Sequence, residues 1–284
     1  MVTSLARSSV SEEQRLFAET NGYLVVEDAL SPDELMTLRT AADRAEAAWR
    51  DNTSLPGWRR ENIEQVQSII EYGDEFVELA AHPKIFPVVR DLLGDDVTLL
   101  FSDYFITPPR TPSQIHWHRD ARLLGPYHPR SRIFAKAFVL LSDVSPEGGG
   151  TAVIPGTHKY DDDWSFPEVE NPIQMPGHVR MAFPAGTIWF MHGRTYHAAL
   201  PNDSDTTRRV LIYSYGHLWM KPWQGYEPSA DVQAKATTAI MRQLMHLGDP
   251  YRYEYDLEEA AKATMSGEDE FEQRRQQKPG RGLR

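Results

Sequence analysis

The chain has 284 residues, 40% of them hydrophobic and 25% charged, an ordinary globular composition with enough apolar residues for one sizeable core. A formal net charge of -11 repels phosphate backbones and argues against a nucleic-acid partner, while the absence of cysteine excludes disulfides, thiolate metal sites and cysteine nucleophiles. No apolar run is long enough to cross a bilayer, and the N-terminus lacks the apolar core of a signal peptide. We therefore expect a cytoplasmic protein without a membrane partner.

The first 95 residues predict a mainly helical layer. A capping box at Ser11 begins a short helix, and a strand follows at 23–26. A second capping box at Ser31, with Pro32 at the first helical position, begins a longer helix that extends to about Trp49. The rest of this layer is predicted as a loop at 51–62 and two helices at about 73–81 and 84–93.

From about residue 96 the pattern changes to short β-rich segments separated by turns rich in Pro, Gly and Asp. Segments this short favour a sandwich or jelly roll over a parallel βαβ sheet. They are expected at 97–106, 133–142, 151–154, 179–183, 186–191 and 209–217. A helix is expected at 229–247, and the charged, Gln-rich residues 267–284 are expected to form a mobile tail.

The expected fold is therefore mainly β with helical support, a jelly roll. We expect residues 1–266 to form a single domain. Its parts are a helical layer at about 9–95, a β core at about 96–218 and the C-terminal helix at about 229–247.

The segment His-Trp-His-Arg-Asp at 116–120 contains the first candidate metal ligands. If the segment is extended, His118 and Asp120 project to the same side, so an imidazole and a carboxylate can reach one ion. Iron(II) in oxygenases takes two imidazoles and one carboxylate and keeps its other positions open. A His-x-Asp triplet is common by chance in a chain with ten histidines, and taken alone it favours a surface turn with a capping Asp.

A second block, at 186–216, supports the site. It supplies His197 after a strand, then a polar turn at 202–205, then Arg208 before another strand. Because the turn lets the second strand run back beside the first, Arg208 can lie near the metal. A guanidinium there can bind a carboxylate bidentately, as a chelating keto acid with a distal carboxylate requires. The alternative role, a solvated charge at a strand edge, suits its neighbour Arg209 better.

Over about residues 20–216 the chain resembles the phytanoyl-CoA dioxygenase-like branch of the iron(II)/2-oxoglutarate oxygenases. The resemblance rests on NGYLVVEDALSPDEL near the N-terminus, LLSDVSPEGGGTAVIPGTHK at 140–159 and the block at 186–216. It implies a double-stranded β-helix of the cupin-like kind, Fe(II) as cofactor, and 2-oxoglutarate and O2 as co-substrates. Arg208 maps onto the residue that anchors the C5 carboxylate of 2-oxoglutarate. The implied metal ligands are His118, Asp120 and His197.

This chain departs from the family pattern at two positions beside these ligands. Many relatives carry Gln or Ser where it has Arg119, and some place a co-substrate-binding Ser where it has Ala199. Arg208 then needs a different hydroxyl partner. The retained Asp120 disfavours halogenation, because related halogenases replace this carboxylate with a small residue to admit chloride.

Two residues of the segment RIFAKAFVLL are candidate co-substrate contacts. Lys136 either points into the active-site cavity toward an anionic group or is an inward-leaning edge-strand lysine that guards against aggregation, and the two roles have equal weight. Phe138 matches a family position that flanks the co-substrate, although by itself it is more often core.

The remaining histidines near the motifs have ordinary structural interpretations. His116 shares the side of His118 in an extended segment, but the spacing of the distal block favours His118 as the ligand. His192 is expected to pack near the ligands, and His158 is expected to be a turn residue.

Three residues are candidate substrate contacts, because loops beside a metal site often touch the substrate. An arginine-rich pocket would favour an anionic small molecule, although a solvated basic loop is the commoner outcome. The candidates are Arg122, His116 and Arg59. The sequence identifies neither the substrate nor the oligomeric state.

We expect hydroxylation of an unactivated C–H bond in a small-molecule metabolite. Desaturation, epimerisation or ring closure by the same centre are alternatives, because the outcome depends on the geometry of the pocket. A non-oxidative metal-dependent cupin-like enzyme would have no need for Arg208, and in a non-catalytic jelly-roll binding module the histidines would be structural.

Overall fold

The computed structural model describes residues 10–52, 57–60, 63–112, 115–120, 132–161 and 163–247, with the backbone alone described at 58–60, 63 and 224. The expected tail at 267–284 and the candidate Arg122 lie outside these residues, as does the side chain of Arg59. That residues 1–266 form one domain stays a prediction.

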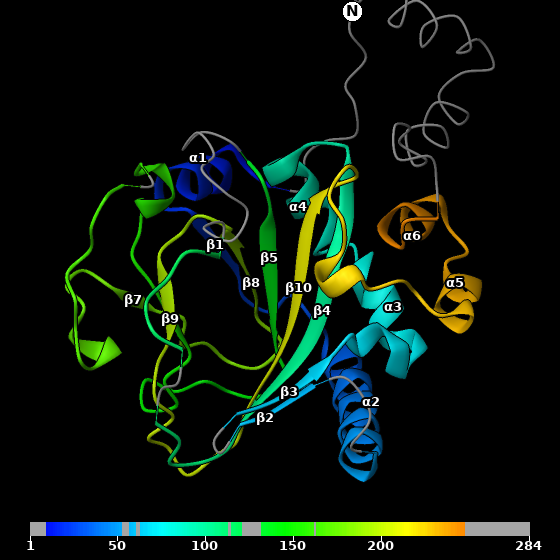
Figure 1. The fold of residues 1–284 in the computed structure, drawn as a ribbon, viewed down its shortest axis with the longest axis horizontal. Helices are drawn as coiled ribbons and strands as arrows, with labels where there is room; N and C mark the ends of the chain where they lie inside the picture. Colours follow the sequence, from blue (N-terminus) through cyan, green and yellow to red (C-terminus); the bar gives the residue numbers. More distant parts are fainter. Residues whose placement is uncertain are drawn as a thin grey trace, which may run out of the picture.

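Two antiparallel sheets form the framework (Figure 1). The larger has seven strands in the order β1 (Tyr23–Val26), β8 (Ile188–His192), β5 (Ala135–Leu140), β10 (Arg208–His217), β4 (Val97–Thr107), β3 (Ile63–Gln67) and β2 (Gly57–Arg60). The smaller has the order β7 (Val179–Arg180), β6 (Thr151–Val153) and β9 (His197–Ala199). Residues of both sheets line one cavity, so the sheets face each other across it. The expected jelly roll, a double-stranded β-helix, is confirmed.

Helices cover the other face of the larger sheet (Figure 1). They are α1 (Glu12–Asn21), α2 (Pro32–Asp51), α3 (Asp74–Ala80), α4 (Phe86–Leu93), α5 (Ala230–Lys235) and α6 (Ala239–Leu244). Both expected capping boxes are present: the Ser11 and Ser31 side chains accept backbone N–H groups at the starts of α1 and α2. These caps set where the two helices begin, as the sequence predicted.

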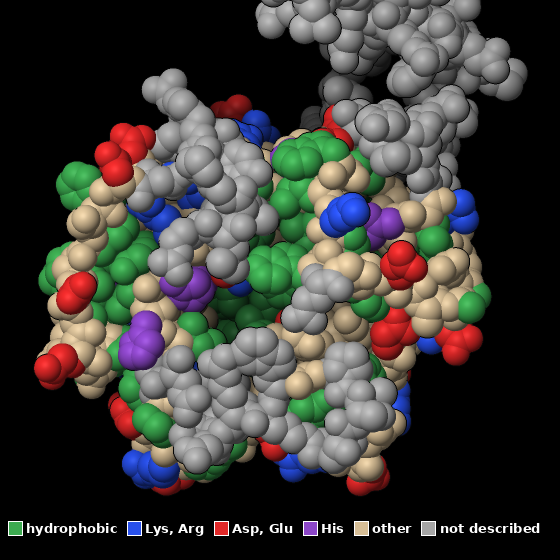
Figure 2. All heavy atoms as spheres, in the orientation of Figure 1, with side chains coloured by type: hydrophobic (Ala, Val, Ile, Leu, Met, Phe, Trp, Pro, Cys, Tyr) green, Lys and Arg blue, Asp and Glu red, His purple; other side chains and the backbone are tan. Residues whose placement is uncertain are grey.

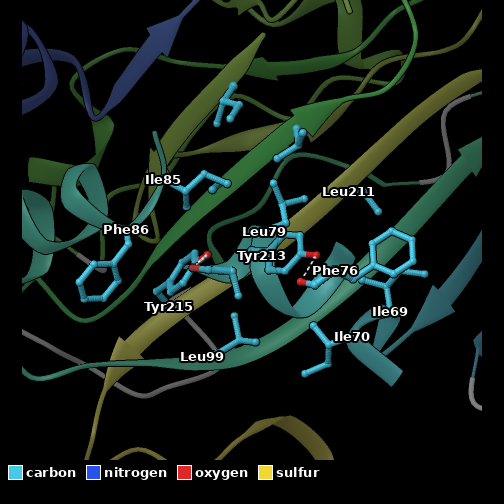
Figure 3. Packing of buried hydrophobic residues seen from close by; sticks show 14 of the residues in the cluster. Ile69, Ile70, Phe76, Leu79, Ile85, Phe86, Leu99, Leu211, Tyr213 and Tyr215 are labelled. Atoms are coloured by element: carbon cyan, nitrogen blue, oxygen red, sulfur yellow. Dashed lines mark hydrogen bonds between the residues drawn. The ribbon is translucent and has the colours of Figure 1, made fainter. Parts of the chain in front are cut away.

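Strand alternation divides β10 between two environments. Leu211, Tyr213 and Tyr215 point toward the helices and are fully buried (Figure 3). The Tyr213 and Tyr215 hydroxyls each donate to a backbone carbonyl of α3, that of Phe76 and that of Ala80, both at 2.9 Å. These bonds satisfy the buried phenols and tie the strand to the helix. The alternate residues of β10, beginning with Arg208, therefore face the space between the sheets.

Two sequence expectations about elements are wrong. The predicted loop at 51–62 contains β2, which pairs with β3 at the edge of the larger sheet. The β2 sequence Gly-Trp-Arg-Arg has no apolar alternation, so this strand forms through its backbone pairing with β3 and not through an apolar pattern. The predicted single helix at 229–247 is two helices, α5 and α6. Thr238 caps α6 by accepting the Met241 N–H at 3.1 Å, and this side-chain bond begins a new helix inside a continuous apolar pattern.

Within the described residues, no helix combines the length and the apolar character needed to cross a membrane.

Candidate metal centre

The two candidate histidine ligands face each other across a backbone pairing. His118 lies outside the regular strands, yet its N–H and C=O exchange hydrogen bonds with the C=O and N–H of His197 on β9, both at 2.9 Å. Their imidazole centroids are 4.2 Å apart. This pairing places both side chains on the same side, toward the larger sheet, because residues directly opposite in an antiparallel pair project to one face.

Each imidazole is oriented by a backbone carbonyl two residues before it. His118 Nδ1 lies 2.8 Å from the His116 carbonyl oxygen, and His197 Nδ1 lies 2.9 Å from that of Thr195. A carbonyl only accepts, so both Nδ1 atoms carry the proton and both Nε2 atoms present a lone pair. This arrangement of a donated Nδ1 proton and a free Nε2 is the usual support of a metal-binding histidine.

Asp120 completes a group of three. Its Oδ1 lies 3.5 Å from His118 Nε2, and its Oδ2 lies 3.4 Å from His197 Nε2. One ligand atom from each residue lies within 4.8 Å of the others, and in the described part of the chain these three residues form the one such group of possible metal ligands. His116 is exposed and lies outside the group, so only its carbonyl contributes.

The electrostatics of the group suit a bound cation. Burial by itself would raise the pKa of Asp120, but the adjacent Lys136 ammonium holds this pKa well below its usual value. Burial lowers the pKa of His197 to about 3, so its imidazole is neutral at physiological pH. Asp120 Oδ2 is buried and accepts no well-directed hydrogen bond, although Lys136 Nζ is 2.7 Å away. Two imidazoles whose Nδ1 atoms donate to backbone carbonyls, beside an under-satisfied carboxylate, fit a divalent metal ion.

A cavity between the two sheets extends from this group. It encloses about 110 Å³, and its lining includes His118 and His197 at one end and Arg208 elsewhere on the wall. Figure 2 shows a hollow in this face of the molecule whose interior is lined by hydrophobic side chains, with histidine at its rim. A small molecule in this space can therefore touch the metal group and a guanidinium together.

Arg208 is a buried cation, 8% exposed, at the start of β10. Its Nη1 donates to the Gly148 carbonyl at 2.7 Å, and its Nη2 donates to Thr107 Oγ1 at 3.3 Å. Burial lowers its pKa to about 10, so it stays charged at neutral pH. These acceptors are neutral oxygens, so the charge is available to pair with an anionic group that enters the cavity.

The next residue along the strand, Arg209, points the other way. Its guanidinium forms ion pairs with Asp43 at 2.6 Å and Glu46 at 3.0 Å, both on α2. As the sequence indicated, Arg209 points away from the cavity. Its charge is paired with acidic side chains of α2 and is not simply solvated.

Lys136 lies on β5, between β10 and β8 in the larger sheet. The edge-strand alternative for this lysine is therefore wrong, and its side chain lines the cavity and contacts Asp120. Phe138 lines the same cavity and stacks on Trp189, with ring centroids 3.8 Å apart.

Two cavity residues were not singled out as contacts by the sequence. Thr107 ends β4 directly opposite Arg208 and supplies the hydroxyl that this arginine needs. Ala199 lines the cavity where some relatives have Ser. A prediction that β4 pairs with β10 would have located Thr107.

His158 and His192 lie outside this cavity. They line a separate pocket that includes residues of α1 and α4, and their ring centroids are 5.2 Å apart.

The chain is similar in sequence to known proteins. The sequence profile of the family described as phytanoyl-CoA dioxygenase (PhyH) matches residues 18–210. An ectoine dioxygenase from Stutzerimonas stutzeri (strain A1501) is 25% identical over 230 residues, which cover 70% of this chain and 74% of the relative.

Solved structures show the same fold at lower identity. HygX from Streptomyces hygroscopicus, solved with nickel and 2-oxoglutarate bound, has a TM-score of 0.62 and 19% identity, covering 78% of this chain and 94% of HygX. The epimerase SnoN, in complex with Fe3+, alpha ketoglutarate and nogalamycin RO, has a TM-score of 0.60 and 23% identity, covering 85% of this chain and 93% of SnoN.

Proposed function

Because the chain belongs to the phytanoyl-CoA dioxygenase (PhyH) family, we propose that it is an iron(II)/2-oxoglutarate-dependent dioxygenase that hydroxylates an unactivated C–H bond of a small molecule. One observation carries the proposal: a cavity between the two sheets is lined both by the histidines of the metal group and by the buried Arg208. A chelating keto acid with a second carboxylate matches these two features.

In this proposal, His118, Asp120 and His197 hold Fe(II), and their three donor atoms leave other positions free for the co-substrates. Bound iron supplies the oxidative chemistry, activating O2 at the expense of 2-oxoglutarate, which becomes succinate and carbon dioxide. The protein holds the Nδ1–H of both imidazoles on backbone carbonyls and keeps Asp120 ionised, so that both Nε2 atoms and the carboxylate are directed to the metal position.

Arg208 would hold the far carboxylate of 2-oxoglutarate through charge-assisted hydrogen bonds, with Thr107 steadying the guanidinium. Phe138 and Trp189 provide an apolar wall that keeps water away from the co-substrate. Lys136 places a second positive charge at the metal end, where the other carboxylate of a keto acid would bind.

The substrate stays a prediction: an anionic small molecule, with His116, Arg122 and Arg59 as candidate contacts, acted on in the cytoplasm. SnoN, of similar fold, is an epimerase, and the same centre here would also support epimerisation, desaturation or ring closure. Analysis of the product distinguishes these outcomes, because hydroxylation adds an oxygen atom from O2 and the others do not.

Anaerobic titration of the protein with Fe(II) and 2-oxoglutarate tests the proposal. We expect the weak visible charge-transfer band of the chelate in wild type and in His116→Ala, and its loss in His197→Ala. His116→Ala is the matched control, because it removes an exposed imidazole from the same segment and keeps the backbone carbonyl that orients His118. No band in wild type, or an unchanged band in His197→Ala, would favour a binding module. Turnover without 2-oxoglutarate would favour a non-oxidative metal enzyme.

A further inference from the structure

The turn that follows the Gly-rich segment, PGTHKYD at 155–161, contacts both segments that carry the metal group. Arg119, which lies between His118 and Asp120, reaches it from one side. Its Nη1 donates to the Asp161 carbonyl at 3.0 Å and its Nη2 to the Thr157 carbonyl at 3.2 Å. One guanidinium thus bridges the two ends of the turn.

Arg194 reaches the same turn from the other segment, just before His197. Its Nε donates to the His158 carbonyl at 3.3 Å, and its Nη2 donates to the Tyr160 carbonyl at 2.7 Å. The turn is also tied to this segment through Thr157, whose hydroxyl accepts the Tyr196 N–H at 2.9 Å. Four carbonyls of one short turn are therefore capped by two guanidiniums from two different segments.

Both arginines are buried far beyond what a surface charge would show: Arg119 is 8% exposed and Arg194 is 1% exposed. Burial of a guanidinium is costly unless its hydrogen bonds are made, so the carbonyl contacts fix these side chains in place. Arg119 is further held by the Phe166 ring, with its guanidinium carbon 5.2 Å from the ring centroid. A side chain that is fixed in this way also restrains the position of its own backbone.

The backbone that Arg119 and Arg194 fix is the backbone of the ligands. Arg119 has a proposed metal ligand on each side, so anchoring its side chain to the turn also restrains the backbone of both neighbours. Arg194 comes one residue before Thr195, whose carbonyl orients the His197 imidazole. The turn thus adds a further link between two segments that also meet through the pairing of His118 with His197, the bond from the Ala199 N–H to the Ile115 carbonyl and the stacking of Trp117 on Tyr196.

We propose that Arg119 and Arg194 are positioning residues that brace the two ligand-bearing segments against the 157–161 turn and so set the geometry of the metal group. The inference rests on the metal site of the proposed function. It assigns a role to two arginines and a turn that the co-substrate chemistry does not use.

Arg119→Gln and Arg194→Lys test the brace by metal affinity, measured with Co(II) in the absence of 2-oxoglutarate, together with denaturant unfolding of the metal-free protein. Gln at position 119 keeps an amide donor and part of the side-chain length, but it removes the charge and the forked guanidinium geometry. Arg110→Gln is the matched control, since Arg110 forms an exposed ion pair with Asp205 on the surface. We expect Co(II) affinity to fall on the order of ten- to hundredfold in Arg119→Gln, with an altered visible Co(II) spectrum, and to stay within twofold in the control.

A merely structural role would lower the stability of the metal-free protein and leave the Co(II) affinity and spectrum of the folded fraction unchanged. That result in both Arg119→Gln and Arg194→Lys would overturn the brace. Arg119→Lys should recover little affinity, because one ammonium does not span the Thr157 and Asp161 carbonyls as a planar guanidinium does. If wild type binds Co(II) no better than His197→Ala, the metal site itself is wrong. If wild type binds Co(II) and both Arg119→Gln and Arg194→Lys bind it equally well, only the brace is wrong.

Discussion

Lys136 Nζ lies 2.7 Å from Asp120 Oδ2, and both side chains are largely buried, at 12% and 10% exposed. Without a metal ion, this ammonium is the nearest full positive charge to the carboxylate. Lys136 therefore stabilises the metal-free protein, because it balances the Asp120 charge that a divalent cation would balance when bound.

Lys136→Met should lower the free energy of unfolding of the metal-free protein by about 3–5 kcal/mol, because it leaves the Asp120 carboxylate buried without its partner. Adding Ni(II) or Co(II) should recover most of this loss, since the metal replaces the missing charge. Urea unfolding with EDTA and with metal measures both effects. In Lys136→Met/Asp120→Asn the loss should be much smaller than in Lys136→Met alone; an equal loss would show that packing, not charge, dominates.

Replacing Arg208 should act on the co-substrate and replacing Arg209 should not. Arg208→Lys keeps the charge but loses the forked donor geometry, so we expect the apparent KM for 2-oxoglutarate to rise about ten- to hundredfold. Arg209→Lys, the matched control, changes an outward ion pair with α2 and should leave this KM within about twofold. Equal effects on KM in the two variants would remove the assignment of Arg208 as the anchor.

Thr107→Val tests whether the threonine hydroxyl steadies Arg208. The change preserves shape and deletes one hydrogen bond, so the KM for 2-oxoglutarate should rise a few-fold, about 1 kcal/mol. Ala199→Ser adds a hydroxyl to the same cavity and should recover part of that loss in the double variant. Steady-state kinetics of the four proteins gives the coupling, and strict additivity would mean that the two positions do not share the co-substrate.

Asp103 predicts a pH dependence of stability. Burial raises its pKa to about 6 from 3.8, against opposing hydrogen bonds from Gln65 and the Ser68 N–H. Between about pH 4 and pH 6 the folded state keeps a proton that the unfolded state releases, so this group makes stability fall as pH rises and level off above pH 6. The total change is roughly 3 kcal/mol.

Asp103→Asn should remove that pH dependence. The difference in unfolding free energy between variant and wild type should therefore shift in favour of the variant by roughly 3 kcal/mol between pH 4 and pH 7. Urea titrations at several pH values measure it. A difference that stays constant over this range would mean that Asp103 ionises normally in the folded protein.

Gly149 and Gly177 form a matched pair for substitution by Ala. Both have a left-handed φ, +77° and +73°, so each substitution costs about 1 kcal/mol from the backbone alone. A Cβ at Gly149 would lie 2.0 Å from the Pro201 carbonyl oxygen, whereas one at Gly177 would meet nothing within 4 Å.

Gly149→Ala should therefore destabilise the protein by about 2–4 kcal/mol, against about 1 kcal/mol for Gly177→Ala. Gly149→Ala should also raise the KM for 2-oxoglutarate, because the neighbouring Gly148 carbonyl accepts a hydrogen bond from Arg208. Thermal unfolding and kinetics of both variants check these outcomes, and equal destabilisation of the two variants would contradict the steric argument.

Local patterns in the sequence were sufficient for much of the framework. The capping boxes at Ser11 and Ser31 begin α1 and α2 where expected, because a cap is made within four residues. The alternation on β10 separates an inward Arg208 from an outward Arg209 for the same reason: side-chain direction follows from position along one strand. The three candidate ligands, which the sequence offered as separate motifs, lie together.

Pairings between distant segments were decided only by the tertiary structure. Residue spacing within the segment does not distinguish His116 from His118, and what separates them is the partner His197, which hydrogen-bonds to the backbone of His118. Thr107 lies beside Arg208 because β4 pairs with β10, a pairing that neither segment's sequence indicates. Lys136 lies in the middle of a sheet because β8 and β10, two strands from much later in the chain, flank β5. No local pattern encodes these neighbours, since each contact is made by residues whose sequence spacing carries no periodic signal.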